Sequence, residues 1–196
     1  MNPLSQSLPS GINPPLTRIT PWSHELVREV LRPGDLAIDL TVGRGRDTLA
    51  LAETVGAAGQ VLGFDLQPAA LAQAAALLRE HGYEAQLARA PDEVPAAPGI
   101  FLARACHSRL AAFVNQPCRV IMANLGYLPG GNQALTTSPE TTLPALERSA
   151  ELLIAGGRLA VTVYPAHAGG AREAAAVDAF FSALPEACWQ VLRLSV

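Results

Sequence analysis

Lysine is absent from this chain of 196 residues, so all 14 basic residues are arginine. Codon usage in a GC-rich genome explains this bias better than any function does, because arginine is a frequent phosphate ligand whatever the genome. The formal net charge of −3 argues against a protein that coats nucleic acid. A local arginine patch that holds one RNA loop remains compatible with that charge.

Long apolar runs and abundant cysteine are also missing. Charges and prolines interrupt every apolar stretch well short of the roughly 20 residues that a membrane-spanning helix needs. Residues 1–11 contain no basic region and no apolar core, so we expect no signal peptide. The three cysteines (Cys106, Cys118 and Cys188) have unrelated spacings, which indicate neither a disulfide framework nor a zinc site. A cytoplasmic protein without a metal site is the simplest expectation.

The composition is that of a globular domain. Hydrophobic residues make up 49% of the chain, too many for a disordered protein. Its length suits one domain with a substantial core. Residues 1–20 contain four prolines and no helical or strand period, so we predict a Pro-rich N-terminal arm followed by one domain over residues 21–196.

Short apolar runs then alternate with helical segments. We expect strands at 36–40, 60–64, 119–123, 158–164 and 189–195, and helices at 21–31, 47–54, 68–81, 143–154 and 171–184. A further strand lies at either 84–89 or 100–104, and the second is favoured because it is more apolar. This alternation predicts an α/β fold, with a mostly parallel sheet covered by helices on both faces.

A glycine-rich turn, DLTVGRGRDT at 39–48, follows the first strand. Gly43 and Gly45 allow a tight turn and a close approach of the backbone to a ligand. Thr48 replaces the third glycine of the dinucleotide fingerprint, which disfavours a pyrophosphate. S-adenosylmethionine carries a cationic amino group that Asp39 can bind, so it fits this turn better than NAD. A turn that only links strand to helix remains the alternative.

An acidic residue ends the second strand region. Asp65 lies 20 residues beyond Gly45, where an acid can accept hydrogen bonds from both hydroxyls of a ribose. Alone, an aspartate in this place is often only a helix cap. Its spacing from the glycine turn favours ribose binding.

The segment NLGYLPGG, at 124–131, follows another apolar run. An asparagine at the end of a strand, followed by a turn and an aromatic residue, can direct an amide carbonyl and a ring at one small planar group. A methyltransferase that acts on an amino group needs such an arrangement. Tyr127 either stacks on a pyrimidine or packs within the turn. In SPETT, at 138–142, we expect Thr142 to cap the next helix.

These motifs, with FDLQ at 64–67 and YPAHAGG at 164–170, resemble one family over residues 22–196. It is the family of small class I methyltransferases known as putative rRNA methylases. Members methylate the aminomethyl group of 5-aminomethyl-2-thiouridine at the wobble position of tRNA. The resemblance implies a Rossmann-like class I methyltransferase fold, S-adenosylmethionine as cofactor and the tRNA anticodon region as partner. It also allows a homodimer, although no interface is legible in the sequence.

The resemblance also implies the residues of the site. The cofactor residues are Asp39, Gly43, Arg44, Gly45, Asp47, Asp65, Gln67, Cys106, His107 and Asn124. The implied catalytic residues are Asn124, which orients the amine, Tyr127, and His167, which takes the amine proton or contacts the RNA backbone. A free alkylamine has a pKa of about 10.4, so the site must desolvate or deprotonate it and aim its lone pair.

The chain departs from the family pattern in four places. Relatives read GNGHDT where this chain has arginine at positions 44 and 46, and they have an acidic residue where Ala105 stands. They have Ser-His where this chain has Cys106-His107, and they continue into a further strand. The chain stops at Val196, so either the sheet lacks its last strand or the sequence is truncated. Methylation of an rRNA base or a small amine, an NAD-linked oxidoreductase and a non-catalytic nucleotide-binding module remain alternatives.

Overall fold

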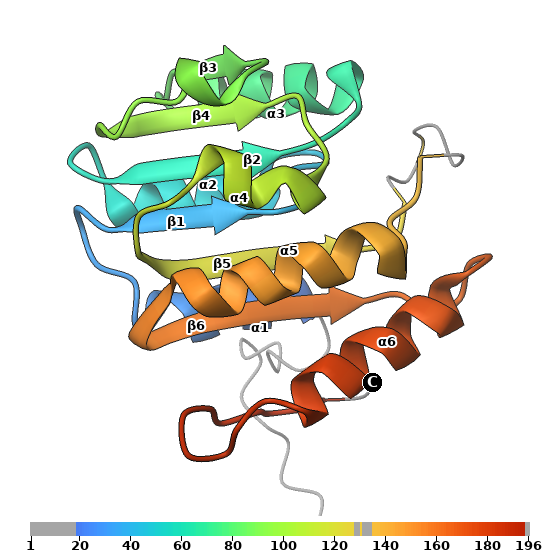
Figure 1. Cartoon of the computed structure of the whole chain (residues 1–196). Coiled ribbons are helices and arrows are strands. Elements are labelled where there is room, and N and C mark those ends of the chain that lie inside the picture. Colours follow the sequence, from blue (N-terminus) through green and yellow to red (C-terminus); the bar gives the residue numbers. More distant parts are fainter. Residues whose placement is uncertain (1–18, 128–129, 131–134, 195–196) are drawn as a thin grey trace, which may run out of the picture.

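The computed structural model describes residues 19–127, 130 and 135–194. It contains a six-stranded, all-parallel sheet with the order β3-β4-β2-β1-β5-β6 (Figure 1). The strands are β1 Leu36–Asp39, β2 Gln60–Phe64, β3 Ala85–Ala88, β4 Gly99–Ala103, β5 Cys118–Leu125 and β6 Leu153–Val163. The helices are α1 Ile19–Arg28, α2 Arg46–Val55, α3 Pro68–Glu80, α4 Leu110–Phe113, α5 Pro139–Leu152 and α6 Gly170–Ser182, with short 3-10 turns η2 Pro91–Glu93 and η3 His107–Arg109.

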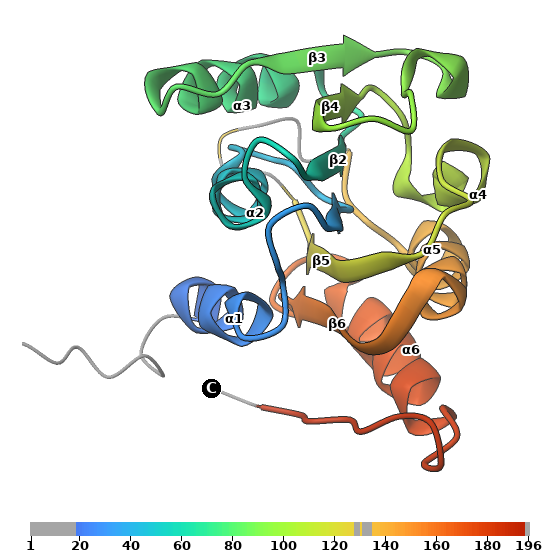
Figure 2. The same cartoon turned by 90° about the vertical axis from the view of Figure 1, so that its left-hand side faces the viewer.

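Helices cover both faces of the sheet, as predicted. Figure 2 shows α1, α2 and α3 on one face and α4, α5 and α6 on the other. Successive residues of a strand point to opposite faces, so Ala37 packs in the first layer while Ile38 packs in the second. Both faces are therefore dry, which explains why the central strands read as nearly continuous apolar runs.

The strand order reverses next to β1, which pairs with β2 on one side and β5 on the other. Ligands of open α/β sheets bind in the crevice outside the carboxyl ends of the strands at such a point. β5 extends beyond β1 at this edge. Asp39, the last residue of β1, pairs with Met122, and β5 continues to Leu125. Asn124 therefore projects beyond β1 at the mouth of this crevice.

The strand at 84–89 or 100–104 proves to be two strands. Both segments are in the sheet, and the favoured one, β4, lies directly beside β2 while β3 forms the edge. β5 is also longer than predicted, since its pairing with β6 continues through Asn124 and Leu125.

The last predicted strand, at 189–195, is wrong. Within the described part of this segment, 189–194, the backbone forms no strand, and the side chains of Val191 and Leu192 are exposed. A sequence with strand propensity forms a strand only where it can pair with another strand and pack against an apolar surface. The sheet therefore ends at β6 in the described residues.

Most of the predicted N-terminal arm, residues 1–18, lies outside the described residues, and α1 begins two residues earlier than predicted. In the described part of the chain, no helix has both the length and the apolar character needed to cross a membrane.

Candidate active site

A pocket of about 550 Å³ opens at the carboxyl ends of the strands, where the strand order reverses. Its lining comes from the segments that follow β1, β2, β4 and β6, from the end of β5 and the segment that follows it, and from Thr20 of α1. All predicted site residues except Asp39 and Gly45 line it. A pocket of this size accommodates a nucleoside-sized ligand.

The glycine turn has the backbone geometry that its sequence predicts. Gly43 and Gly45 have φ angles of 50° and 81°, in the left-handed region that favours glycine. A Cβ on Gly45 would lie 2.7 Å from the Cα of Ala74 in α3. Gly45 thus lets α2 pack closely against α3, and Gly43 forms the pocket wall.

Asp65 ties the glycine turn to the end of β2. One carboxylate oxygen accepts a hydrogen bond from the Gly43 amide at 2.9 Å, and the other accepts one from the Gln67 amide at 2.8 Å. Burial raises the pKa of this carboxyl, while the backbone hydrogen bonds oppose that rise. Each carboxylate oxygen can accept a second hydrogen bond, so the side chain can still receive ribose hydroxyls.

Asp39 lies beneath the turn and is fully buried. Its oxygens accept hydrogen bonds from the Thr48 hydroxyl at 2.6 Å and the Thr41 amide at 3.0 Å. Desolvation and then the charge of Asp47 raise the pKa of Asp39 to about 7. In this conformation Asp39 supports the loop from below, and its contact with a cationic amino group stays a prediction.

Asn124, at the end of β5, has a side-chain amide whose nitrogen is hydrogen-bonded and whose oxygen is not. Its Nδ2 donates to an oxygen of Asp47, in the first turn of α2, and its backbone amide donates to the Thr41 hydroxyl at 2.7 Å. Its carbonyl oxygen is buried and has no hydrogen-bond partner among the described residues. An unsatisfied acceptor in a pocket suits a ligand that donates a hydrogen bond.

Tyr127 and His167 stand together on another wall of the pocket. Their rings form an edge-to-face pair with centroids 5.8 Å apart, and the tyrosine is 42% exposed. The Nδ1 atom of His167 lies 3.0 Å from the Ala168 carbonyl, which assigns the proton of a neutral ring to Nδ1. Nε2 is buried, and the structure shows no partner for it in the described residues.

Cys106 and His107 follow β4. The Ser108 hydroxyl donates to the Cys106 sulfur at 3.1 Å. Burial lowers the pKa of His107 to about 4, although a hydrogen bond to the Leu40 carbonyl opposes this shift. His107 is therefore neutral at physiological pH, and its buried Nε2 finds no partner in the described part of the chain.

Comparison with known proteins identifies the family of this chain. The family described as "Putative rRNA methylase" matches residues 61–196. This chain belongs to it. Two solved structures agree with that assignment. One is described as a "putative rRNA-methylase" from Clostridium thermocellum (31% identity, TM-score 0.74, 85% of this chain and 82% of that one). The other is described as a "putative methyltransferase" from Streptococcus mutans in complex with SAH (31% identity, TM-score 0.71, 90% and 86%).

A curated relative carries a substrate in its name. The chloroplastic tRNA (mnm5s2U34)-methyltransferase of Arabidopsis thaliana is 36% identical over 179 residues. The match covers 88% of this chain and 62% of the relative's length. The Rossmann-like methyltransferase fold expected from the sequence is confirmed by the sheet and by the solved structures.

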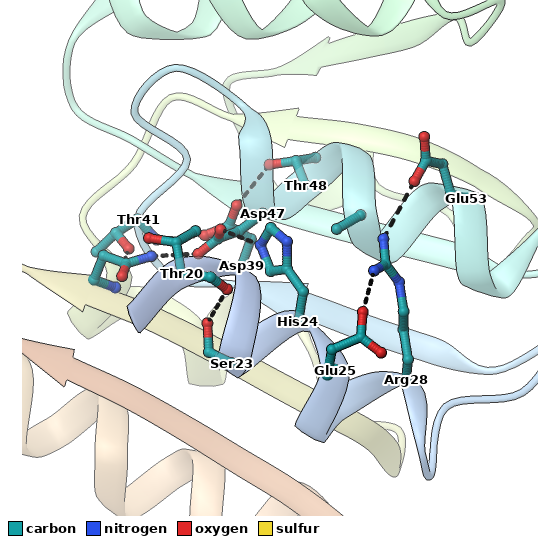
Figure 3. Close-up of polar contacts among 12 residues, drawn as sticks. Thr20, Ser23, His24, Glu25, Arg28, Asp39, Thr41, Asp47, Thr48 and Glu53 are labelled. Atoms are coloured by element: carbon teal, nitrogen blue, oxygen red, sulfur yellow. Dashed lines mark hydrogen bonds and ion pairs between the residues drawn. The ribbon is translucent and has the colours of Figure 1, made fainter. Parts of the chain in front are cut away.

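Two residues that contact the pocket lining were not predicted from the sequence. His24 of α1 lies 2.7 Å from Asp47 (Figure 3). Glu173 of α6 is fully buried against Thr137 of the loop after β5 and Thr142 of α5. Both partners lie more than 20 positions away along the chain. No local pattern signals the His24 contact, and for Glu173 the sequence offers only a carboxylate in an alanine-rich helix.

Proposed function

We propose that this chain is an S-adenosylmethionine-dependent N-methyltransferase that acts on tRNA. Its substrate is the aminomethyl group of the modified wobble uridine, and it converts 5-aminomethyl-2-thiouridine to 5-methylaminomethyl-2-thiouridine. The observation that carries this proposal is the buried, unpartnered carbonyl oxygen of Asn124 in the pocket wall. The name of the Arabidopsis relative supports the choice of tRNA.

The pocket residues fit the cofactor. Asp65 can accept the ribose hydroxyls, and the neutral His107 offers a lone pair at Nε2 to an amino group such as that of adenine. Gly43 lets the backbone come close to the ligand. S-adenosylmethionine, when bound, supplies an electrophilic methyl group on a sulfonium cation.

The remaining residues prepare the acceptor amine. Asn124 Oδ1 accepts an N–H of the amine and so fixes the direction of its lone pair. The partly buried site disfavours the ammonium form, because burial lowers the pKa of an amine. The Nε2 atom of His167 is the candidate acceptor for the proton that the methylated amine releases. Tyr127, on the exposed side, can stack on the splayed pyrimidine.

The test is methyl transfer to tRNA that carries an aminomethyl wobble uridine, at saturating cofactor. We expect Asn124→Ala to lower kcat by roughly 100-fold, or about 2.7 kcal/mol of barrier, because it loses the group that aims the nucleophile. Cofactor affinity, measured by calorimetry, should stay within about threefold of the parent, which is under about 0.7 kcal/mol. Asn115→Ala is the matched control, since this asparagine is exposed and does not line the pocket.

Parental activity of Asn124→Ala would remove the amine-orienting role. Parallel reactions with rRNA, with tRNA lacking the aminomethyl group and with small amines test the substrate. Methylation of any of these in preference to the aminomethyl tRNA would overturn the tRNA proposal, and binding of NAD in preference to S-adenosylmethionine would overturn the cofactor.

A further inference from the structure

Three side chains from distant parts of the sequence form one hydrogen-bonded chain at the pocket. His24 of α1 and Asp47 of α2 meet with 2.7 Å between Nε2 and Oδ1. The other Asp47 oxygen accepts the hydrogen bond of Asn124 Nδ2 from β5. Figure 3 shows α1 lying along α2, with the His24 ring directed at the Asp47 carboxylate. Asp47 is 5% exposed, so solvent does little to satisfy it.

Hydrogen-bond chemistry determines the orientation of each member of this chain. An ionised carboxylate only accepts hydrogen bonds, so Asn124 must turn its NH2 group toward Asp47 and its carbonyl away from it. For the same reason His24 must present an N–H at Nε2. The two donors bind different oxygens of Asp47, which holds the carboxylate in one rotational position.

Loss of His24 would release this arrangement. One Asp47 oxygen would become an unpaired, nearly buried acceptor, and the carboxylate would turn to compete for the remaining donors. The Asn124 amide would then lose the partner geometry that directs its carbonyl oxygen into the pocket. Since Thr20 also lines the pocket, α1 forms part of the site and does not merely cover the sheet.

We propose that His24 is a positioning residue for methyl transfer, which acts through Asp47 to direct the Asn124 carbonyl at the acceptor amine. This inference rests on the function proposed above. It assigns the N-terminal helix a role in catalysis that neither the glycine turn nor the NLGYLPGG segment predicts.

The activity test compares two substitutions of His24. His24→Leu keeps the bulk without a donor, and we expect kcat to fall about 10-fold while the KM for tRNA and the affinity for cofactor stay within about threefold. His24→Gln keeps an N–H donor at a position close to Nε2, and we expect kcat to recover to within about threefold of the parent. A residue with a merely structural role would not show this rescue.

The control is Arg28→Ala, one helical turn further along α1. Arg28 bridges to Glu53 of α2 at 3.5 Å, so its loss weakens the same pair of helices without touching the pocket (Figure 3). We expect parental kcat for this variant. A loss as large as that of His24→Leu would show that helix docking alone explains the effect, and would overturn the proposal.

A second measurement does not depend on activity. In ¹⁵N-labelled protein, the side-chain amide signals of Asn124, assigned by their loss in Asn124→Ala, report its bond to the carboxylate. We expect them to move toward the positions of exposed asparagines in His24→Leu and to stay in place in His24→Gln and Arg28→Ala. If both kcat and these signals remain parental in His24→Leu, the proposal fails. A parent that binds cofactor but does not methylate tRNA would instead refute the proposed function, and the amide signals would still decide whether His24 positions Asn124.

Discussion

Two aspartates at the ends of adjacent strands have different surroundings and therefore different roles. Asp65 lines the pocket and keeps accepting capacity for a ligand, while Asp39 is enclosed beneath the glycine turn. Both have raised pKa values because both are desolvated. Substitution should separate the carboxylate that is predicted to bind a ligand, Asp65, from the one that supports the turn, Asp39.

For Asp65, we expect Asp65→Ala to weaken binding of S-adenosylmethionine or its demethylated product by about 10- to 150-fold. The variant loses a charge-assisted acceptor for two hydroxyls, which costs roughly 1.5–3 kcal/mol. Titration calorimetry measures this directly. Equal affinity of variant and parent would exclude Asp65 from the cofactor site.

For Asp39, we expect a pH-dependent effect on stability. The pKa rises from 3.8 to about 7 on folding, so between about pH 4 and pH 7 the folded state holds a proton that the unfolded state has lost. The free energy of unfolding of the parent therefore falls as pH rises through this window, and is constant above it as far as Asp39 is concerned. Asp47 and Asp65, the charges that face Asp39, are unchanged when Asp39 alone is substituted.

Asp39→Asn should lack this part of the decline, because an amide does not titrate and can donate to Thr48 while accepting from Thr41. Urea denaturation of parent and variant across pH 4.5–7.5 gives the comparison. The stability difference in favour of the variant should grow with pH. A difference that is independent of pH would contradict the raised pKa.

At the scale of elements, a buried carboxylate of α6 holds the loop that follows β5. Glu173 accepts hydrogen bonds from the hydroxyls of Thr137 at 2.7 Å and Thr142 at 2.6 Å. Thr137 in turn binds the backbone of Gly126 in both directions, at 2.8 and 3.1 Å. The predicted helix cap at Thr142 is wrong, because Ser138 takes the N-cap position and Thr142 faces Glu173 instead.

We expect Glu173→Ala to lower the free energy of unfolding by about 2 kcal/mol or more, since it leaves two hydroxyls without their acceptor. The KM for tRNA should rise because the loop after β5, which begins at Gly126 and Tyr127, loses the hydrogen bond from Thr137 to Glu173. Cofactor affinity should change little. Glu140→Ala is the matched control: it breaks an exposed ion pair between the same two helices, α5 and α6, and should leave stability nearly unchanged. Equal stability of the Glu173 variant and the control would contradict this account.

At the scale of the whole molecule, the parallel sheet brings all strand ends to one edge. This explains why motifs at positions 43, 65, 107 and 124, spread over the first two thirds of the chain, line one pocket. β6 forms one border of the sheet, and its residues are partly buried or exposed. The pairing of the strands therefore determines both the position of the pocket and the exposed border.

The sequence by itself was enough to predict the fold class and ten of the residues that line the pocket. The core strands around Ile38 and Ile121 are apolar runs that can be recognised from the sequence. Glycine in a strand-to-helix turn likewise indicates the positive φ angle that the structure shows there. Because the ends of parallel strands meet at one edge, position along the chain was sufficient to predict that Asp65 and Asn124 lie together, whereas His107 was implied by the family resemblance.

Only the tertiary structure decided the rest. His24 and Glu173 act through partners distant in sequence, and the direction of the Asn124 carbonyl depends on a carboxylate that a different element supplies. The segment at 189–194 has the composition of a strand but no partner to pair with in the described chain. Local patterns report propensity and burial, whereas hydrogen-bond partners and strand neighbours depend on which distant surfaces meet when the chain folds.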